Sequence, residues 1–558
     1  MKYLNSPKIP IFLVFFIGCF IGFLSHLSIQ DGLYNSQIVV NLMDYGKDDL
    51  MYIWGINLWT VMSQVTGFLL AIGINESVQS IILSVVLNGL SFMSLYLILN
   101  SISRNSLLSL ALVLMTYFSK HYLYGLSYEV SMYSWDFYNS TWGNFGFHFA
   151  LLSLGLIFSN YLRVGYFLLG AMLSIHFFIG SFFIGTILLA NIVTKNNEGI
   201  KLKGKWFAYG LFFSVVSYII NYSQYGAIDV GGAQISIDNY ITNWDTHRNS
   251  SLDYLRSAIL TNLFCLFFTG YLFFFKKIRG IFSLSWFFSA SVACFVILIF
   301  YVLSLIDLFP FLYVAMPERM FNFLYYLSIP TACALAVRRG RSFPVLLFPV
   351  IIMFDYFFHF LFFDIVSFCL LILLLLVSVF PIFIKKNYED KMALGLIGLC
   401  IISIGLNSNF KERINNIDKS FYNERNSFLK RSDGMLLVSP MHIASKVQLF
   451  TRRKIIMDAT ELSEISYAFH TYSKANMIMK EIYKIELNDD YKNLFVIHNG
   501  VETVSPGYVR KIWENRDPKE WRNLFVKYQI SQVLVPSNWN LKIKSVYSDS
   551  NDKVYEIN

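Results

Sequence analysis

Acidic side chains that could do chemistry follow the first long apolar run of the chain. Asp31 comes a few residues after that run, and Asp44 lies further along the same polar stretch. A carboxylate there could take the proton of an incoming hydroxyl or amine as a general base, or hold a divalent cation. A solvated loop acid is the competing interpretation. Asp48 and Asp49 are adjacent, so the Asp-x-Asp spacing of a metal clamp is missing and a solvated turn is favoured.

Further polar candidates lie in aromatic-rich stretches. Asp136 stands between two apolar runs, while His148 lies in Phe145-Gly-Phe-His-Phe and His176 in Ser174-Ile-His-Phe-Phe. A histidine N–H could donate a hydrogen bond to a phosphate or a leaving group. The alternative is a histidine that is satisfied within the protein or at an interface.

One arginine directly precedes an apolar run, in the tripeptide Pro317-Glu318-Arg319. A guanidinium group suits bidentate phosphate binding, so Arg319 is a candidate phosphate ligand with Glu318 beside it. An ion pair between the two residues, or a side chain that reaches from an apolar surface to water, is the alternative.

The elements that must position these residues are apolar. Of 558 residues, 55% are hydrophobic, 18% aromatic and 15% charged, whereas soluble domains carry roughly 25% charged residues. A water-exposed surface cannot be built from most of this chain, so we expect a polytopic membrane protein. The net charge of +9 comes from basic residues in short loops, which is typical of cytoplasmic loops and needs no nucleic acid.

The cysteines exclude two classes of site. All six lie in apolar runs, far apart and without Cys-x-x-Cys spacing, which excludes a disulfide framework and a thiolate zinc site. They are Cys19, Cys265, Cys294, Cys333, Cys369 and Cys400.

Apolar runs of near-spanning length recur along the first 407 residues, and we read the first of them as an uncleaved helix with a cytoplasmic N-terminus. A transmembrane domain over 1–407, with a first outer loop at 29–76, is expected to contain about thirteen crossings. The expected runs are 9–28, 77–100, 107–123, 145–159, 164–175, 178–192, 206–220, 259–275, 281–305, 321–337, 343–362, 365–384 and 392–406.

The short run 57–74 leaves the topology open, because it either crosses or returns to its own side. If it does not cross, Arg104, Arg163 and the lysines of 195–205 share the cytoplasmic side. That alternative fits the positive-inside bias better.

The last part of the chain has a different pattern. Charged residues become frequent over 408–558, and β-type runs alternate with helical ones, which predicts a small α/β domain on the extracytoplasmic side. The longest helical pattern covers 506–528. Strands are expected at 435–438, 454–457, 494–497, 532–535 and 553–557.

This organisation resembles the GT-C superfamily of glycosyltransferases that use lipid-phosphate sugars. Asp31-Gly-Leu-Tyr is similar to the catalytic-acid segment of that family, and 98–107 with Arg104 is similar to its cytoplasmic turn. Three tail segments are similar to tails of bacterial members: Asp433-Gly-Met-Leu-Leu-Val-Ser-Pro, Arg453-Lys-Ile-Ile-Met-Asp458 and Trp513-Glu-Asn-Arg-Asp-Pro-Lys-Glu-Trp521.

The resemblance implies an inverting transfer of a sugar from a polyprenyl-phosphate donor, docked from the membrane lipid, to a glycan, lipid or protein of the cell envelope. It implies Asp31 as the base, Asp44 or Asp136 as a second acid, and Arg319 as the phosphate ligand. Trp135-Asp136-Phe137 only partly matches the Trp-Trp-Asp of oligosaccharyltransferases, so protein N-glycosylation is not favoured.

Other functions stay open for a multi-pass protein of the inner or plasma membrane. A flippase or transporter of lipid-linked glycans is one alternative, although transporters often contain repeats and this chain shows none. A glycan polymerase or ligase and a non-catalytic membrane scaffold are the others.

Overall fold

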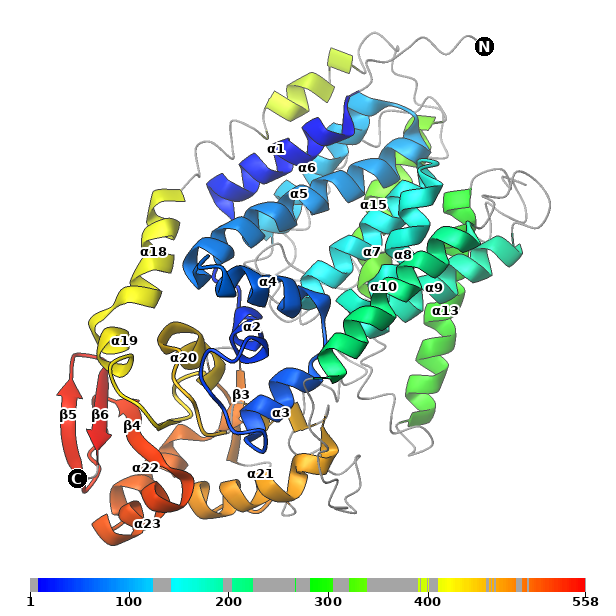
Figure 1. Ribbon diagram of the computed structural model, residues 1–558. Helices are drawn as coiled ribbons and strands as arrows, with labels where there is room; N and C mark the ends of the chain where they lie inside the picture. Colours follow the sequence, from blue (N-terminus) through cyan, green and yellow to red (C-terminus); the bar gives the residue numbers. More distant parts are fainter. Residues whose placement is uncertain are drawn as a thin grey trace, which may run out of the picture.

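A computed structural model gives the arrangement of a mainly helical protein with a small C-terminal sheet (Figure 1). The structure describes residues 9–123, 142–193, 203–223, 266, 282–304, 321–338, 390–391, 393–398, 400, 410–457, 461–462, 464–465, 468–487, 494–498 and 501–556.

Among the described residues, nine apolar helices build a bundle, and they occupy runs in which helices were expected. They are α1 (Ile11–Ser25), α5 (Glu76–Ser103), α6 (Ser106–Leu123), α7 (Trp142–Phe158), α8 (Leu162–Ile175), α9 (Phe177–Val193), α10 (Gly204–Tyr222), α13 (Phe282–Ser304) and α15 (Phe321–Arg338). The expected runs 259–275, 343–362 and 365–384 lie outside the residues that the structure describes, apart from a single helical residue at 266.

The length of these helices limits what the structure says about membrane crossing. Within the described part of the chain, α5 alone is long and apolar enough to span a membrane by itself. A sharply bent pair, α3 (Leu50–Asn57) and α4 (Val61–Ala71), passes the same test when taken together, and six further apolar helices are shorter. The expected count of about thirteen crossings is therefore not confirmed.

Helices α1 and α5 pack antiparallel through small residues. A Cβ atom at Gly22 would lie 2.6 Å from the Cβ of Asn88, and one at Gly18 would lie 2.7 Å from the Cβ of Phe92. Glycine therefore allows the two backbones to approach closely. Beyond the end of α1, Gln30 continues the contact, because its amide donates to Ser84 at 2.9 Å.

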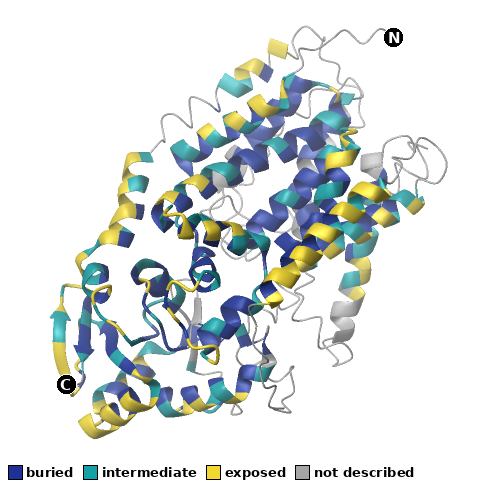
Figure 2. Ribbon diagram, viewed as in Figure 1, coloured by how far each residue is buried: buried dark blue, intermediate teal, exposed yellow. Residues whose placement is uncertain are grey.

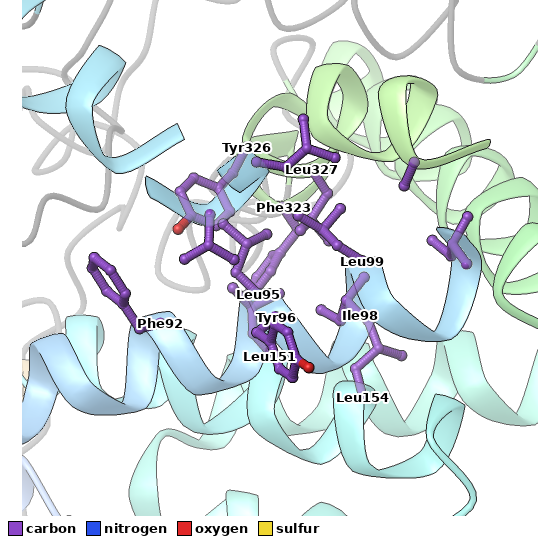
Figure 3. Close-up of a cluster of buried hydrophobic side chains, with 14 of the residues drawn as sticks. Phe92, Leu95, Tyr96, Ile98, Leu99, Leu151, Leu154, Phe323, Tyr326 and Leu327 are labelled. Carbon is purple, nitrogen blue, oxygen red and sulfur yellow. The ribbon is translucent and has the colours of Figure 1, made fainter. Parts of the chain in front are cut away.

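The centre of the bundle is a continuous apolar core. Figure 3 shows side chains of α5, α7 and α15 meeting there, with Leu95, Leu151 and Phe323 among them. The ring of Phe147 stacks on that of Phe323 at a centroid distance of 4.3 Å. Such interdigitated packing holds α7 and α15 against the long helix α5.

Helix α4 begins and ends at the same end of the bundle. Thr60, its N-cap, donates to the carbonyl of Ile175 at 2.8 Å, and Gln79 at the start of α5 donates to the carbonyl of Ile74 at 2.9 Å. An 11-residue helix is about 16 Å long, too short for a bilayer. The chain bends by 117° between α3 and α4. Both ends of α4 thus lie at one end of the bundle, and whether 57–74 crosses a membrane stays a prediction.

The C-terminal region forms a four-stranded sheet of order β1-β4-β6-β5 and a separate hairpin. Strand β1 pairs with β4 in parallel, while β6 is antiparallel to both β4 and β5. The strands are β1 (Met435–Val438), β2 (Phe495–His498), β3 (Val501–Val504), β4 (Ile530–Pro536), β5 (Lys544–Ser548) and β6 (Asp552–Glu556). The helices are α18 (Phe410–Tyr422), α19 (Glu424–Leu429), α20 (Ala444–Thr451), α21 (Tyr472–Ile478), α22 (Pro506–Asn515) and α23 (Pro518–Tyr528), with short turns at Phe469–Thr471 and Met479–Tyr483.

Two sequence-based expectations for this region need correction. The run 454–457 contributes one bridge, between Ile455 and Leu436, and is not a strand. The pattern over 506–528 is two helices, because Asp517 caps a new helix and Pro518 occupies its first turn. The carboxylate of Asp517 accepts from the backbone N–H groups of Lys519 and Glu520, which ends α22 and starts α23.

The segment after α1 joins the core of the C-terminal region. It contains α2 (Leu33–Val39) and α3, and its buried residues Ile38, Tyr45 and Trp54 belong to the same apolar cluster as Trp513 and Trp521. The indole of Trp54 donates to the hydroxyl of Thr471 at 3.0 Å. We call residues 410–556 the tail domain, and the segment with α2 and α3 packs on it.

Candidate active site where the bundle meets the tail domain

Asp31 lies in the turn between α1 and α2, at the end of the bundle that carries the tail domain. The backbone of this turn is fixed, since its carbonyl accepts from the N–H of Tyr34 at 3.2 Å. The side chain is 37% exposed, and one of its oxygens lies 3.8 Å from the ammonium of Lys446 on α20. A half-open carboxylate therefore faces a cation supplied by the tail domain.

The surroundings of Asp31 act on its pKa in two directions. Removal from water by surrounding protein raises the pKa of Asp31, and the charge and hydrogen bonding of Lys446 lower it, with a net rise. The pKa of Asp31 is thus raised although 37% of its side chain stays exposed. A general base benefits from a raised pKa provided that it stays ionised at the working pH.

Trp142, the first residue of α7, covers the backbone next to Asp31. A Cβ atom at position 32 would lie 2.5 Å from the indole ring, so only Gly32 fits beneath it. The indole nitrogen of Trp142 is buried and finds no acceptor among the described residues, and the side-chain oxygen of Gln30 is likewise buried without a donor there. Two polar atoms with unused hydrogen-bonding capacity thus belong to the residues around Asp31.

Helix α20 is docked on this end of the bundle by a row of hydrogen bonds. The amide of Gln37 donates to the carbonyl of Leu449 at 3.0 Å, and that of Gln448 donates to the carbonyl of Tyr34 at 3.2 Å. Successive residues of α20 therefore contact successive residues of α2. Lys446 lies at the N-terminal end of this row of contacts, beside Asp31.

The buried carboxylate of Glu76 holds the C-terminal end of α20 against the bundle. Arg452 donates two hydrogen bonds of 2.8 Å to the two oxygens of Glu76, the first residue of α5, and Gln37 adds a third of 2.8 Å. The Glu76 side chain is only 5% exposed. Such bidentate geometry fixes orientation as well as distance, so α20 is held in one position on the bundle.

Asp44, the second candidate acid, lies elsewhere on the tail domain. It is exposed and has a left-handed backbone (φ 48°), and its carbonyl accepts from Lys454 at 3.4 Å. The following residue, Tyr45, is buried and donates to Gln448 at 3.0 Å. No contact of the described residues joins Asp44 to Asp31.

The two candidate histidines lie where α7 meets the junction of α8 and α9. His148 is fully buried in α7, with its ring 6.5 Å from that of Tyr326. His176 separates α8 from α9, and its Cβ lies 2.6 Å from the position that a Cβ of Gly146 would take. The backbone N–H of Ile179 reaches the Nδ1 of His176 at 3.5 Å. His176 therefore packs against α7 at Gly146, and His148 has no exposed surface.

Three candidate residues, Asp136, Glu318 and Arg319, lie outside the described residues. Over the residues that are described, no group of three or more His, Cys, Asp or Glu side chains could hold a metal ion.

Sequence reasoning missed the partners of Asp31. Lys446 lies in Ser439-Pro-Met-His-Ile-Ala-Ser-Lys, which has no spacing typical of a site. Trp142 could have been noticed as an aromatic residue that opens an apolar run, yet its contact with Gly32 depends on how α7 packs. Neither residue carries a local pattern that separates it from the many other lysines and aromatic residues.

Comparison with known proteins gives no family for this chain. No family model matches it, and no curated protein is significantly similar to it. The resemblance to the GT-C superfamily therefore stays a prediction, carried by the residues and by the architecture.

Proposed function

We propose that this chain is a membrane-embedded glycosyltransferase of the GT-C type, located in the inner or plasma membrane, with about thirteen crossings. It transfers a sugar from a polyprenyl-phosphate donor to an envelope glycan, lipid or protein. Asp31 is its general base, at the membrane surface on the extracytoplasmic side. The observation that carries the proposal is the partly exposed carboxylate of Asp31, 3.8 Å from Lys446, where the apolar bundle meets the tail domain.

Exposed apolar surface supports the membrane part of the proposal. Helix α10 carries large exposed hydrophobic side chains along most of its length, among them Phe212, Val215 and Ile219, and Figure 2 shows much of α10 as exposed. Helix α1 exposes Phe12 and Phe16 in the same way. Water-soluble monomers rarely expose patches of this kind, whereas lipid chains would cover them.

The distribution of charge supports the orientation. Arg104 follows the last residue of α5, and Arg338 at the end of α15 donates to the carbonyl of Ile102, so both arginines lie at one end of the bundle. The tail domain lies at the other end, where Arg452 holds Glu76. Helix α5 separates the two ends by about 42 Å, enough to cross a bilayer. By the positive-inside bias the arginine end is cytoplasmic and the tail domain is extracytoplasmic.

The proposed reaction is a single displacement at the anomeric carbon. Asp31 takes the proton of the acceptor hydroxyl, and the acceptor oxygen forms a bond to that carbon. The bond between the carbon and the donor phosphate oxygen breaks, and the lipid phosphate leaves with the electron pair. Attack from the face opposite the phosphate inverts the configuration. Arg319 is the proposed phosphate ligand.

A transfer assay tests this proposal. The full-length protein in lipid nanodiscs is incubated with a polyprenyl-phosphate sugar and membrane-extracted envelope glycan, and release of lipid phosphate is measured. The D31N substitution is expected to lower turnover by about a hundredfold to ten-thousandfold, because base assistance is lost while the shape is kept. Donor binding should persist.

The matched control is D48N, which changes an acid of the same loop whose side chain is 88% exposed. It should leave turnover within a factor of two or so, as expected for a surface site. Equal activity of D31N and the unsubstituted protein would refute the proposal. Movement of the intact donor across the bilayer without release of lipid phosphate would instead identify a flippase.

A further inference from the structure

The tail domain places a charge beside the proposed base. Lys446 lies 3.8 Å from Asp31, and both side chains are partly exposed, at 42% and 37%. The lysine belongs to a helix that is clamped to the bundle, because Arg452 and Leu449 of the same segment are bound by Glu76 and Gln37. Its position relative to Asp31 is therefore set by the docking of the whole tail domain.

The other elements around Asp31 supply little charge. Helix α2 contains no charged residue, and the single charged residue of α5 on this side, Glu76, is neutralised by Arg452. Further titratable groups on the packed elements of the described chain include His26 at the end of α1, Tyr34 of α2, His148 of α7, and Glu461, which accepts from the N–H of Ser445 at the start of α20. Among the described residues, Lys446 is the cation whose field acts on Asp31.

We infer that Lys446 is a positioning residue, by which the docked tail domain keeps the carboxylate of Asp31 ionised and oriented for proton abstraction. The inference rests on the proposed function for its catalytic meaning. The tail domain then contributes a residue to the proposed site, because Lys446 of α20 lies beside Asp31 of the first loop.

The chemistry explains why a lysine is needed there. Partial burial favours the neutral form of a carboxyl group, and a neutral group cannot accept the proton of the acceptor hydroxyl. An ammonium close to one oxygen favours the ionised form, while the other oxygen remains available. Loss of the cation should therefore raise the pKa of Asp31 and leave less of the base ionised at a given pH.

A titration tests the inference independently of turnover. The full-length protein is labelled with carbon-13 at the aspartate carboxyl groups in nanodiscs, and Asp31 is assigned by difference from D31N. The K446Q variant is expected to raise the pKa of Asp31 by about half a unit or more. The K446R variant, which keeps the charge, should titrate like the unsubstituted protein.

The matched control is K474Q. Lys474 also joins the tail domain to an acid of the first loop, at 3.3 Å from Asp48, with a similar exposure of 38%. It should leave the pKa of Asp31 unchanged. An unchanged pKa in K446Q, or an equal rise in K474Q, would overturn the inference. Folding is checked by elution volume, and the comparison of K446R with K446Q removes any general effect of substitution.

A pH profile then links the pairing to turnover. In K446Q the acid limb of kcat/KM should move to higher pH by the amount seen in the titration, with KM for the donor unchanged at high pH. A fall in kcat/KM that is the same at every pH would assign Lys446 a structural role and overturn the inference. Absence of transfer in the unsubstituted protein would refute the proposed function, while the titration would still decide the pairing.

Discussion

The carboxylate of Asp552 shows how single residues hold the tail domain together. It lies at the start of β6 and is bound on both oxygens, by Nε2 of His442 at 2.7 Å and by Arg425 at 2.7 Å. The other nitrogen of His442 hydrogen-bonds Ser439 at 2.9 Å. Ser439 is fully buried, so this Ser-His-Asp arrangement joins β1, β6 and α19 without presenting a nucleophile to a substrate.

The same carboxylate makes tail-domain stability depend on pH. Burial raises the pKa of Asp552, but His442 and Arg425 outweigh burial and hold the pKa below its usual range. The stabilisation is therefore complete above about pH 4, the unfolded pKa, and is lost as pH falls through the folded pKa.

We expect D552N to lower the free energy of unfolding by about 2 kcal/mol at pH 7, because two charge-assisted hydrogen bonds are lost. The difference should shrink below pH 4. Denaturant unfolding followed by tryptophan fluorescence at pH 7 and pH 3 measures it, with D418N on exposed α18 as the control. A difference of equal size at both pH values would contradict this account of Asp552.

At the residue scale the sequence predicted one part of the candidate site and not the other. Asp31 could be selected because an acid just beyond an apolar run of near-spanning length is expected near a membrane surface. Lys446 and Trp142 could not, because each meets the Asp31 turn only after segments far apart in the chain have packed. Asp44 lies further along the same polar stretch as Asp31, and the structure places it on the rim of the tail domain.

At the scale of elements, apolar composition predicts where most helices lie, and helix-capping residues determine where a helix ends and the next begins. Apolar runs predicted α5 to α10 because their residues can be buried or lipid-covered on all sides. The break between α22 and α23 was missed although Asp517-Pro518 is a helix-start signal, because the apolar spacing continues across it. Strand β5 was missed since its residues are half-exposed and lack a long apolar run.

Close contacts between helices rest on individual glycines. At the crossing of α8 and α10, a Cβ atom at Gly210 would lie 2.1 Å from the carbonyl oxygen of Phe167, and one at Gly170 would lie 2.4 Å from that of Phe207. Backbone atoms cannot move aside as a flexible side chain can. The two helices must therefore separate if either glycine gains a side chain.

We expect G210A to destabilise the bundle by about 1 to 3 kcal/mol, the usual cost of overpacking. The control is G185A on α9, where a Cβ would meet no atom of the described residues within 4 Å. That variant should match or slightly exceed the original stability, since alanine favours helix. Thermal unfolding in detergent compares them, and equal melting temperatures for both variants would contradict the packing at this crossing.

At the scale of the whole molecule, the described residues form a bundle core and a tail core, and a third apolar cluster with Leu33, Trp142 and Leu449 lies beside the proposed site. The bundle core contains α5, α7 and α15, and the tail core contains both the C-terminal strands and the segment with Trp54. The first loop thus contributes Asp31 to the junction and Trp54 to the tail core, which ties the position of the proposed base to the docking of the tail domain. Asp31, Trp142 and Lys446 come together only because segments far apart in the sequence pack at this junction.

The position of the bound donor tests the central claim most directly. A structure of the full-length protein in nanodiscs, determined with a non-hydrolysable polyprenyl-phosphate sugar, would locate the anomeric carbon. We expect this carbon within about 4 Å of the acceptor position that hydrogen-bonds Asp31, at the end of the bundle that carries the tail domain. A donor bound at the opposite end, beside Arg104 and Arg338, would contradict the account.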